Sequence, residues 1–367
     1  MGGCVTKRHI AMFFVCVGLP GTAGKHFVPE QGEGFTMQQL FAEVTPARLS
    51  GFSVGTVTMM NDWHYPMLND HNRTAFYKAM LTESVTGESV VLDLGAGTGL
   101  LSVLAAQAGA KRVYAVEANR ELAEVARAVI KLAGFADRVT VYHTMSTDLQ
   151  ANQLPEPANV LVSEIFGTLL LTESAEVYVA DAFHRGLLHK SAQTLPQIGE
   201  QLVQLVSAPE LMRLSAATET GGVDLSRANS FRDTVSLKYS KTLGVPLRYL
   251  GLQPLAPPVT VLQLDFRQTP NVNRHDKASV RADRSGVVHA LLATWNAWPD
   301  HRRTHLLTTD LNMTADNLPR TLSWGQGIQM VDPFNVQVGD SITLHTRWRG
   351  PGMHIQPTVQ RCDSRPP

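Results

Sequence analysis

The chain has 367 residues, of which 17% are charged, 44% are hydrophobic and 7% are aromatic. At roughly 150 residues per domain, this length predicts about two domains, each large enough to bury a core. Lysine plus arginine (32) equals aspartate plus glutamate (32), so no direct binding of nucleic acid through bulk positive charge is expected, although a local basic patch stays open.

The N-terminus carries two competing targeting patterns. The basic residues 7–9 before the apolar stretch 10–19 imitate a short secretory signal. Gly2 and Cys4 instead fit the M-G-x-x-x-[ST] pattern of N-terminal acylation. An unstructured leader is the third interpretation, and we assign residues 1–45 to a leader or extension.

The cysteines indicate the compartment. Cys4, Cys16 and Cys362 lie near the termini without metal-ligand spacing, which excludes a disulfide scaffold and a zinc site built from cysteine. No apolar run reaches the length of a membrane-spanning helix, about 18 residues or more. We therefore expect a cytoplasmic protein without a transmembrane segment, with the nucleus as a second location.

The first strong structural signal is a strand followed by a glycine loop. Residues 90–94 are apolar except for Asp93, and they run into G-x-G-x-G at 95–99 before a helical stretch over 100–108. This order is typical of one half of a nucleotide-binding βαβ unit. The third glycine of the dinucleotide fingerprint is replaced by Leu100. The loop instead resembles the S-adenosylmethionine (AdoMet) loop of class I methyltransferases.

The next elements extend this unit. Residues 111–117 predict a second strand that ends on Glu117, where a carboxylate accepts hydrogen bonds from ribose hydroxyls. A third strand is predicted over 138–142, and Met145 and Ser146 beyond it would flank an adenine ring. The helix between the two strands has apolar residues at helical spacing, namely Leu122, Val125, Val129 and Leu132.

A fourth predicted strand, 158–162, leads to two acidic residues. Glu164 follows the strand, and Glu173 comes nine residues later across an apolar segment. The ends of parallel strands are where open α/β sheets bind ligands. The string S-E-x(8)-E resembles the double-glutamate loop of protein arginine methyltransferases.

The resemblance to this family spans about residues 58–350. Residues 64–74 are similar to its H-x-x-M-L-x-D-x-x-R-[TN] segment, and 322–326 lie where the family has a T-H-W-x-Q loop. It implies that AdoMet is the methyl donor, that S-adenosyl-L-homocysteine is the product, and that no metal is needed. It also implies Glu164 and Glu173 as catalytic residues. The implied cofactor-binding residues are His64, Met67, Arg73, Asp93, Gly95, Gly97, Glu117, Met145 and Ser146, and the implied substrate-binding residues are Asp70, Ser323, Trp324 and Gln326.

Two carboxylates suit a guanidinium substrate. The planar guanidinium fork can be gripped bidentately, and its pKa is too high for simple deprotonation. Glu164 and Glu173 would draw its positive charge to one side and leave the other nitrogen to attack the methyl group. The repulsion between guanidinium and sulfonium, about 4 kcal/mol at ~4 Å and an effective dielectric near 20, would be offset by the pair.

After Ala182 the pattern changes to period-two alternation, as in 201–206 and 259–266, which predicts antiparallel strands. The predicted fold class is α/β, with a class I AdoMet-dependent methyltransferase Rossmann-like domain followed by an antiparallel β-barrel domain. The predicted domains are 46–190 and 191–367. The resemblance implies that about 212–241 is a dimerisation arm and that the chain forms a head-to-tail homodimer.

The late loop departs from the family pattern. Ser323 replaces its histidine and Leu322 its threonine, which with residues 63–70 looks most similar to the type III, monomethylating branch. The implied substrates are arginine-rich segments of histones or RNA-binding proteins. Two alternatives stay open, namely a small-molecule AdoMet methyltransferase and a methyltransferase-like scaffold without turnover.

Overall fold

The computed structural model describes residues 47–49, 51–60, 64–231, 237–239, 251–310, 324–350 and 352–361. The predicted leader 1–45, with Gly2 and Cys4, lies outside the described residues, and so does Ser323.

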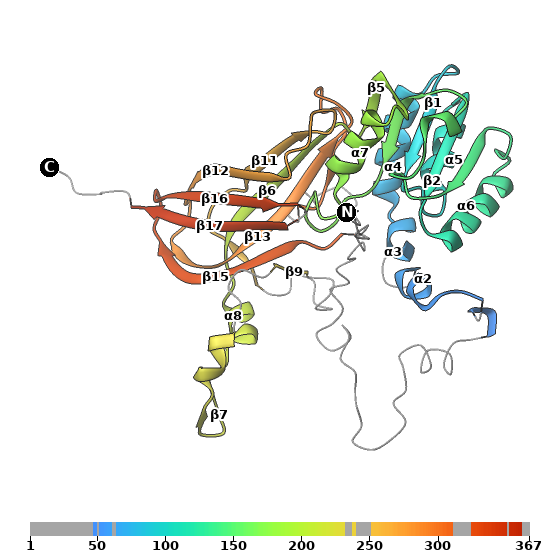
Figure 1. Cartoon of the computed structure of the whole chain (residues 1–367). Coiled ribbons are helices and arrows are strands. Elements are labelled where there is room, and N and C mark those ends of the chain that lie inside the picture. Colours follow the sequence, from blue (N-terminus) through green and yellow to red (C-terminus); the bar gives the residue numbers. More distant parts are fainter. Residues whose placement is uncertain are drawn as a thin grey trace, which may run out of the picture.

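The N-terminal half contains a five-stranded parallel sheet in the order β3-β2-β1-β4-β5 (Figure 1). All five residues of β1 are buried, as are five of the six in β2, as expected for parallel strands covered on both faces. The apolar runs read from the sequence therefore form the centre of this sheet. Its strands are β1 (Val90–Leu94), β2 (Arg112–Glu117), β3 (Val139–His143), β4 (Ala158–Ser163) and β5 (Leu188–Leu195).

Helices cover this sheet and precede it. The backbone of the loop requires glycine at three positions, because Gly95, Gly97 and Gly99 have φ values of 79°, 54° and 84°, a region that favours glycine. Asn119 starts α6 by accepting a hydrogen bond from the backbone N–H of Leu122 at 3.0 Å. The helices of this half are α2 (Val54–Met59), α3 (Tyr65–Leu68), α4 (His71–Ser84), α5 (Leu100–Gln107), α6 (Arg120–Leu132) and α7 (Ala175–His184), with 3-10 turns η1 (Ala47–Leu49) and η3 (Ala151–Gln153).

The C-terminal half is built from antiparallel strands, as predicted. The change from parallel to antiparallel pairing falls between β5 and β6. A seven-stranded sheet has the path β10-β6-β13-β15-β9, with β11 on β6 and β14 on β13, and a three-stranded sheet has the order β12-β16-β17. The strands are β6 (Ile198–Ser207), β9 (Leu237–Tyr239), β10 (Gln253–Pro254), β11 (Val259–Asp265), β12 (Asn273–Arg281), β13 (Gly286–Trp298), β14 (Leu307–Thr308), β15 (Gly327–Val336), β16 (Ser341–Arg349) and β17 (Gly352–Gln360).

The two halves share one hydrophobic core. A single cluster of buried residues runs from α4 through β1 and β4 to β13 and β16. The segment between β4 and α7 lies at this junction, where Leu169, Leu170 and Leu171 are buried. Phe166 packs against Phe266 and Trp295 of the barrel, with ring centroids 5.5 and 5.7 Å apart. The loop that carries both glutamates is therefore wedged between sheet and barrel.

A short helical segment leaves the barrel after β6 and projects away from it (Figure 1). It consists of α8 (Pro209–Ser215), the hairpin of β7 (Glu219–Thr220) and β8 (Val223–Asp224), and the 3-10 turn η4 (Ser226–Phe231). The predicted arm, 212–241, begins inside α8, and residues 232–236, 240 and 241 lie outside the described part. Among the described residues, no helix is long and apolar enough to cross a membrane.

Candidate active site

Arg73 enters the site from the first turn of α4. Asp70 caps this helix, because its carboxylate accepts a hydrogen bond from the backbone N–H of Arg73 at 3.0 Å. Asp70 is 1% exposed, so it positions Arg73 from within the protein. A capping aspartate accepts from a backbone N–H two or three residues later, and Arg73 is three residues after Asp70.

The guanidinium of Arg73 forms an ion pair with Glu164, whose side chain is 5% exposed. It also donates to the carbonyl oxygen of Met67 at 3.3 Å, and its carbon lies 5.8 Å from the ring centroids of both Tyr77 and Trp324. Burial with these partners raises the pKa of Glu164, although the charge of Arg73 opposes that rise. The cation therefore fixes one of the two predicted catalytic carboxylates from the side of α4.

The glycine loop lies beside the end of β2. Glu117 is buried, and its two carboxylate oxygens accept from the backbone N–H groups of Gly97 and Asn119, each at 2.7 Å. His64 lies over the loop, since a β-carbon on Gly97 would approach its Nε2 to 3.9 Å. Four of the predicted cofactor residues, including Gly95, thus surround one turn.

Asp93 and Arg73 each keep a buried polar atom that has no hydrogen-bond partner among the described residues. Asp93 accepts from the Ser102 hydroxyl at 2.5 Å through Oδ2, whereas its Oδ1 has no partner. The Nε of Arg73 is also buried without one. Burial raises the pKa of Asp93 to about 7. One free donor and one free acceptor fit a zwitterionic ligand, such as the amino-acid end of AdoMet.

Glu173 is the second carboxylate of the loop. Its side chain is accessible to solvent, yet protein surrounds it closely enough that desolvation, followed by the charge of Glu164, raises its pKa to about 7. The charge of Glu164 contributes to this rise, as expected for two carboxylates on one loop. A guanidinium between them would lower both pKa values and remove the repulsion.

Three side chains from the barrel hold the glutamate loop by its backbone. Trp324 donates its indole N–H to the carbonyl oxygen of Phe166 at 2.7 Å, and Trp295 donates to that of Gly167 at 2.8 Å. Gln201 accepts from the backbone N–H of Leu170 at 3.0 Å. Of these three residues, only Trp324 was expected from the sequence. Trp295 and Gln201 were missed because they stand in no motif.

The remaining predicted residues lie farther from the glutamates or have other partners. The amide of Gln326 donates to the carbonyl oxygen of Thr309 at 3.1 Å and is buried. Met145 and Ser146 follow β3 and are half-buried, on the side of Glu117. Among the described residues, no group of three or more His, Cys, Asp or Glu side chains could hold a metal ion.

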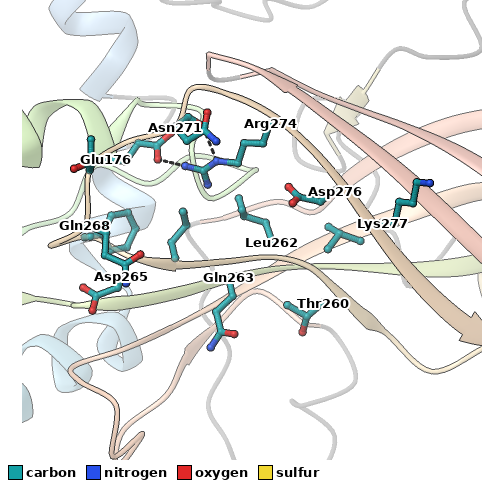
Figure 2. A pocket seen from close by; sticks show the side chains of 14 residues that line it. Glu176, Thr260, Leu262, Gln263, Asp265, Gln268, Asn271, Arg274, Asp276 and Lys277 are labelled. Carbon is teal, nitrogen blue, oxygen red and sulfur yellow. Dashed lines mark hydrogen bonds and ion pairs between the residues drawn. The ribbon is translucent and has the colours of Figure 1, made fainter.

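A separate groove of about 550 Å³ lies along β11 and β12 (Figure 2). Figure 2 shows Arg274 reaching from β12 to Glu176 at the start of α7 and to Asn271, and the ion pair with Glu176 is buried. None of the predicted site residues lines this groove. Its ion pair instead connects Glu176 of α7, three residues after Glu173, to the barrel.

Comparisons with known proteins agree with this geometry. Residues 69–201 match the family model described as ribosomal protein L11 methyltransferase (PrmA). The chain is 33% identical over 291 residues to "Arginine N(omega)-methyltransferase" of Streptomyces achromogenes subsp. streptozoticus, covering 78% of this chain and 76% of that protein. It is 42% identical over 309 residues to "Probable protein arginine N-methyltransferase 6" of Arabidopsis thaliana, covering 81% of this chain and 67% of that one.

Two further matches define how far the likeness extends. "Protein arginine N-methyltransferase 7" of Oryza sativa subsp. japonica is 32% identical over 244 residues, which cover 62% of this chain and 34% of that protein. The chain therefore spans only about a third of that relative. The solved structure of the Trypanosoma brucei PRMT1 enzyme-prozyme heterotetrameric complex with AdoHcy aligns with a TM-score of 0.68 and 22% identity, covering 82% of this chain and 93% of that chain, which supports the fold.

Proposed function

The chain belongs to the protein arginine N-methyltransferase family, and from this premise we propose that it transfers a methyl group from AdoMet to a guanidino nitrogen of arginine. The observation that carries the proposal is the pair Glu164 and Glu173 on one loop, with Glu164 fixed by Arg73. Methyltransferases of small molecules that carry no guanidinium share the cofactor half but have no need for this pair. A scaffold without turnover would have no need for it either.

The residues around the glycine loop have the chemistry to hold AdoMet, which supplies the electrophilic methyl group. Arg73 would pair with the carboxylate of its amino-acid end, and Asp93 would accept from the ammonium group. Glu117 would accept from the ribose hydroxyls, and Met145 with Ser146 would border the adenine. The free Nε of Arg73 and Oδ1 of Asp93 support this assignment.

Glu164 and Glu173 would bind the substrate guanidinium and localise its charge. The attacking nitrogen would then keep lone-pair character. Its bond to the methyl carbon would form as the carbon–sulfur bond of AdoMet breaks, with S-adenosyl-L-homocysteine as the leaving group and the surplus guanidinium proton passing to a carboxylate or to water. Proximity and preorganised charge supply most of the rate in such a reaction. Because the loop is held by backbone hydrogen bonds, the carboxylates need little rearrangement when the substrate arrives.

The test is transfer of radiolabelled methyl groups from AdoMet to an arginine-rich peptide, to the same peptide with lysine at every arginine, and to free arginine. We expect label on the arginine peptide alone. Label on free arginine alone would agree with the name of the Streptomyces relative, which mentions arginine and no protein, and would restrict the substrate class to the amino acid. No transfer to any acceptor would support the scaffold.

For the product, we propose monomethylarginine, and as substrates arginine-rich segments of histones or RNA-binding proteins. The support is Ser323 in the place of the family's histidine, a residue outside the described part of the chain. Mass spectrometry of the methylated peptide checks this assignment. Abundant dimethylarginine would exclude the type III branch while leaving arginine methylation intact. The cytoplasm, with the nucleus second, stays our prediction for where it acts.

We propose that the chain forms a head-to-tail homodimer through the projecting arm. Three of the large apolar side chains exposed among the described residues lie on it, with exposures of 65% for Leu214, 58% for Val223 and 43% for Leu225. Exposed apolar side chains that cluster on a projection mark an association surface. Sedimentation velocity should show a dimer that L214S/V223S converts to a monomer, and an unchanged sedimentation coefficient would exclude the arm.

A further inference from the structure

The outward face of the β12-β16-β17 sheet collects basic side chains from all three strands. Successive residues of a strand point to opposite faces, and the inward positions, such as Leu344, Trp348 and Ile355, are buried. The outward positions include seven basic or imidazole side chains, which we call the basic face: Lys277, Arg281, Arg347, Arg349, His275, His345 and His354.

The strand register brings these side chains together. Lys277 lies opposite His345, and in the next outward row Arg347 lies between His275 and His354. Side chains directly opposite one another on a sheet are about 5 Å apart at Cβ, and diagonal neighbours about 7–8 Å. Lys277 and Arg347 are diagonal neighbours, so their charges act on the same ligand.

The basic face carries no carboxylate. The only acidic residue in the three strands is Asp276, which alternates to the inward register and lines the groove of Figure 2. No ion pair is found between the four lysine and arginine side chains and any carboxylate in the described part of the chain. Cations elsewhere do have such partners, as in Arg302 with Asp300 and Arg303 with Glu200.

Such a face is not explained by stability. Like charges that are neighbours on a sheet are destabilising, and a balanced chain has acidic residues available to alternate with them. The face is also hollowed by a depression of about 340 Å³, which is bordered by six of its residues, His275, Lys277, His345, Arg347, Gln356 and Thr358, and by Asp276 and Thr346 of the inward register. An anionic group in this depression would be within reach of basic side chains from β12 and β16.

The side chains of the basic face favour one class of anionic partner over the others. None of the exposed large apolar side chains of the described chain lies on it, so it lacks the side chains that insert into a lipid surface. It has no phenylalanine, tyrosine or tryptophan side chain for stacking on bases. Its other outward residues are small or amide side chains that donate hydrogen bonds, such as Asn273, Thr343 and Gln360. Phosphodiester oxygens accept hydrogen bonds from such a mixture of cationic and neutral donor side chains.

We propose that the basic face binds the phosphodiester backbone of a nucleic acid without reading its sequence. The neutral net charge argues against binding through bulk charge, and this face is the local exception that the composition leaves open. The surface lies on the barrel, apart from the glutamate loop, so binding there does not depend on methyl transfer. It would hold a substrate protein that is itself bound to nucleic acid.

The test measures the anisotropy of a fluorescein-labelled RNA, about 20 nucleotides of mixed sequence, against the full-length chain over a series of salt concentrations. Each engaged cation contributes about −0.7 to the slope of log K against log salt for a single strand. K277Q/R347Q should therefore reduce the steepness of that slope by about 1.4. A second sequence of equal length should bind equally well.

The matched control is K131Q/K190Q, which changes the net charge equally on exposed lysines of the other half of the molecule. It should leave the slope unchanged, and methyl transfer to a short peptide should be the same in both variants. Equal effects of the two double variants would overturn the proposal. So would binding to phosphatidylserine vesicles that K277Q/R347Q abolishes while RNA binding stays unchanged, because the face would then serve a lipid surface.

Discussion

The indole N–H of Trp295 donates to the carbonyl oxygen of Gly167 at 2.8 Å, across 128 residues of sequence. One residue of a barrel strand thereby holds the loop that carries Glu164 and Glu173. The barrel thus supports the loop of the candidate active site. The consequences can be measured one contact at a time.

Replacing Trp295 with phenylalanine should lower kcat about tenfold with a small change in KM. The ring stays packed on Phe166 and Trp324, but the buried carbonyl of Gly167 loses its donor, which costs about 1–3 kcal/mol. Steady-state kinetics with an arginine peptide measure the split between the two constants.

The matched control is W348F, because the Trp348 indole is equally buried and its N–H has no partner among the described residues. It should leave kcat unchanged. If W295F and W348F reduce kcat equally, the hydrogen bond to Gly167 has no role beyond general packing.

Gly199 is needed for the approach of the glutamate loop to the barrel. A β-carbon there would come within 2.7 Å of Leu170 Cδ2 and 3.2 Å of Phe266. We expect G199A to destabilise the fold by about 1–3 kcal/mol and to reduce activity, since Leu170 must move. Chemical denaturation with kinetics checks both effects, and G87A, with nothing within 4 Å of the new methyl group, serves as control. Equal unfolding free energies for the two variants would contradict the packing argument.

Activity should depend on pH near neutrality. The pKa of Glu173 is raised to about 7 in the free protein, so below that pH its carboxyl is increasingly protonated and cannot bind a guanidinium. We therefore expect kcat/KM for the peptide to fall as the pH drops through about 7. Asp93 has a pKa raised to about the same value, so the profile reports both groups.

The two contributions can be separated by their ligands. Asp93 is assigned to the donor AdoMet, so its protonation should weaken AdoMet binding measured by calorimetry. Glu173 should leave that binding unchanged. A profile of kcat/KM that stays flat between about pH 6 and 8 in the native protein would contradict the role of Glu173.

AdoMet binding and turnover should depend on the planar guanidinium of Arg73. R73K keeps a charge, but an ammonium cannot contact Glu164, the carbonyl of Met67 and a ligand carboxylate in one plane. AdoMet affinity should fall about tenfold or more, and kcat should fall with it because Glu164 loses its fixed partner. R185K, which alters an ion pair with Asp181 away from the site, is the control. Unchanged AdoMet affinity in R73K would remove Arg73 from the donor site.

The first four strands of the parallel half were readable from the sequence because they are largely apolar runs, whereas β5, which contains His189, Lys190 and Gln193, was not predicted. The helix after β2 shows the limit of such patterns. Its predicted stripe included Leu132, which is 88% exposed, whereas Ala126 and Ile130 are buried. Small residues pack where helices approach closely, and hydrophobicity alone does not reveal that approach.

The supports of the site could not be predicted from local pattern. β6 alternates in sequence, but nearly all its residues are buried, because its polar positions face other parts of the protein. Gln201 bonds Leu170 and Thr294 there, and Gln204 bonds Ala256. These contacts join segments far apart in the chain. They depend on how the fold packs, and no spacing of residues in the sequence indicates them.

The central claim is that Glu164 and Glu173 bind the guanidinium as a pair. The most direct measurement is single-turnover methyl transfer to an arginine peptide by the native protein, E164Q and E173Q, each saturated with AdoMet as confirmed by calorimetry. We predict that E173Q binds AdoMet as the native protein does and that each variant transfers methyl groups at least about a hundredfold more slowly. Transfer at the native rate by either variant would contradict the claim.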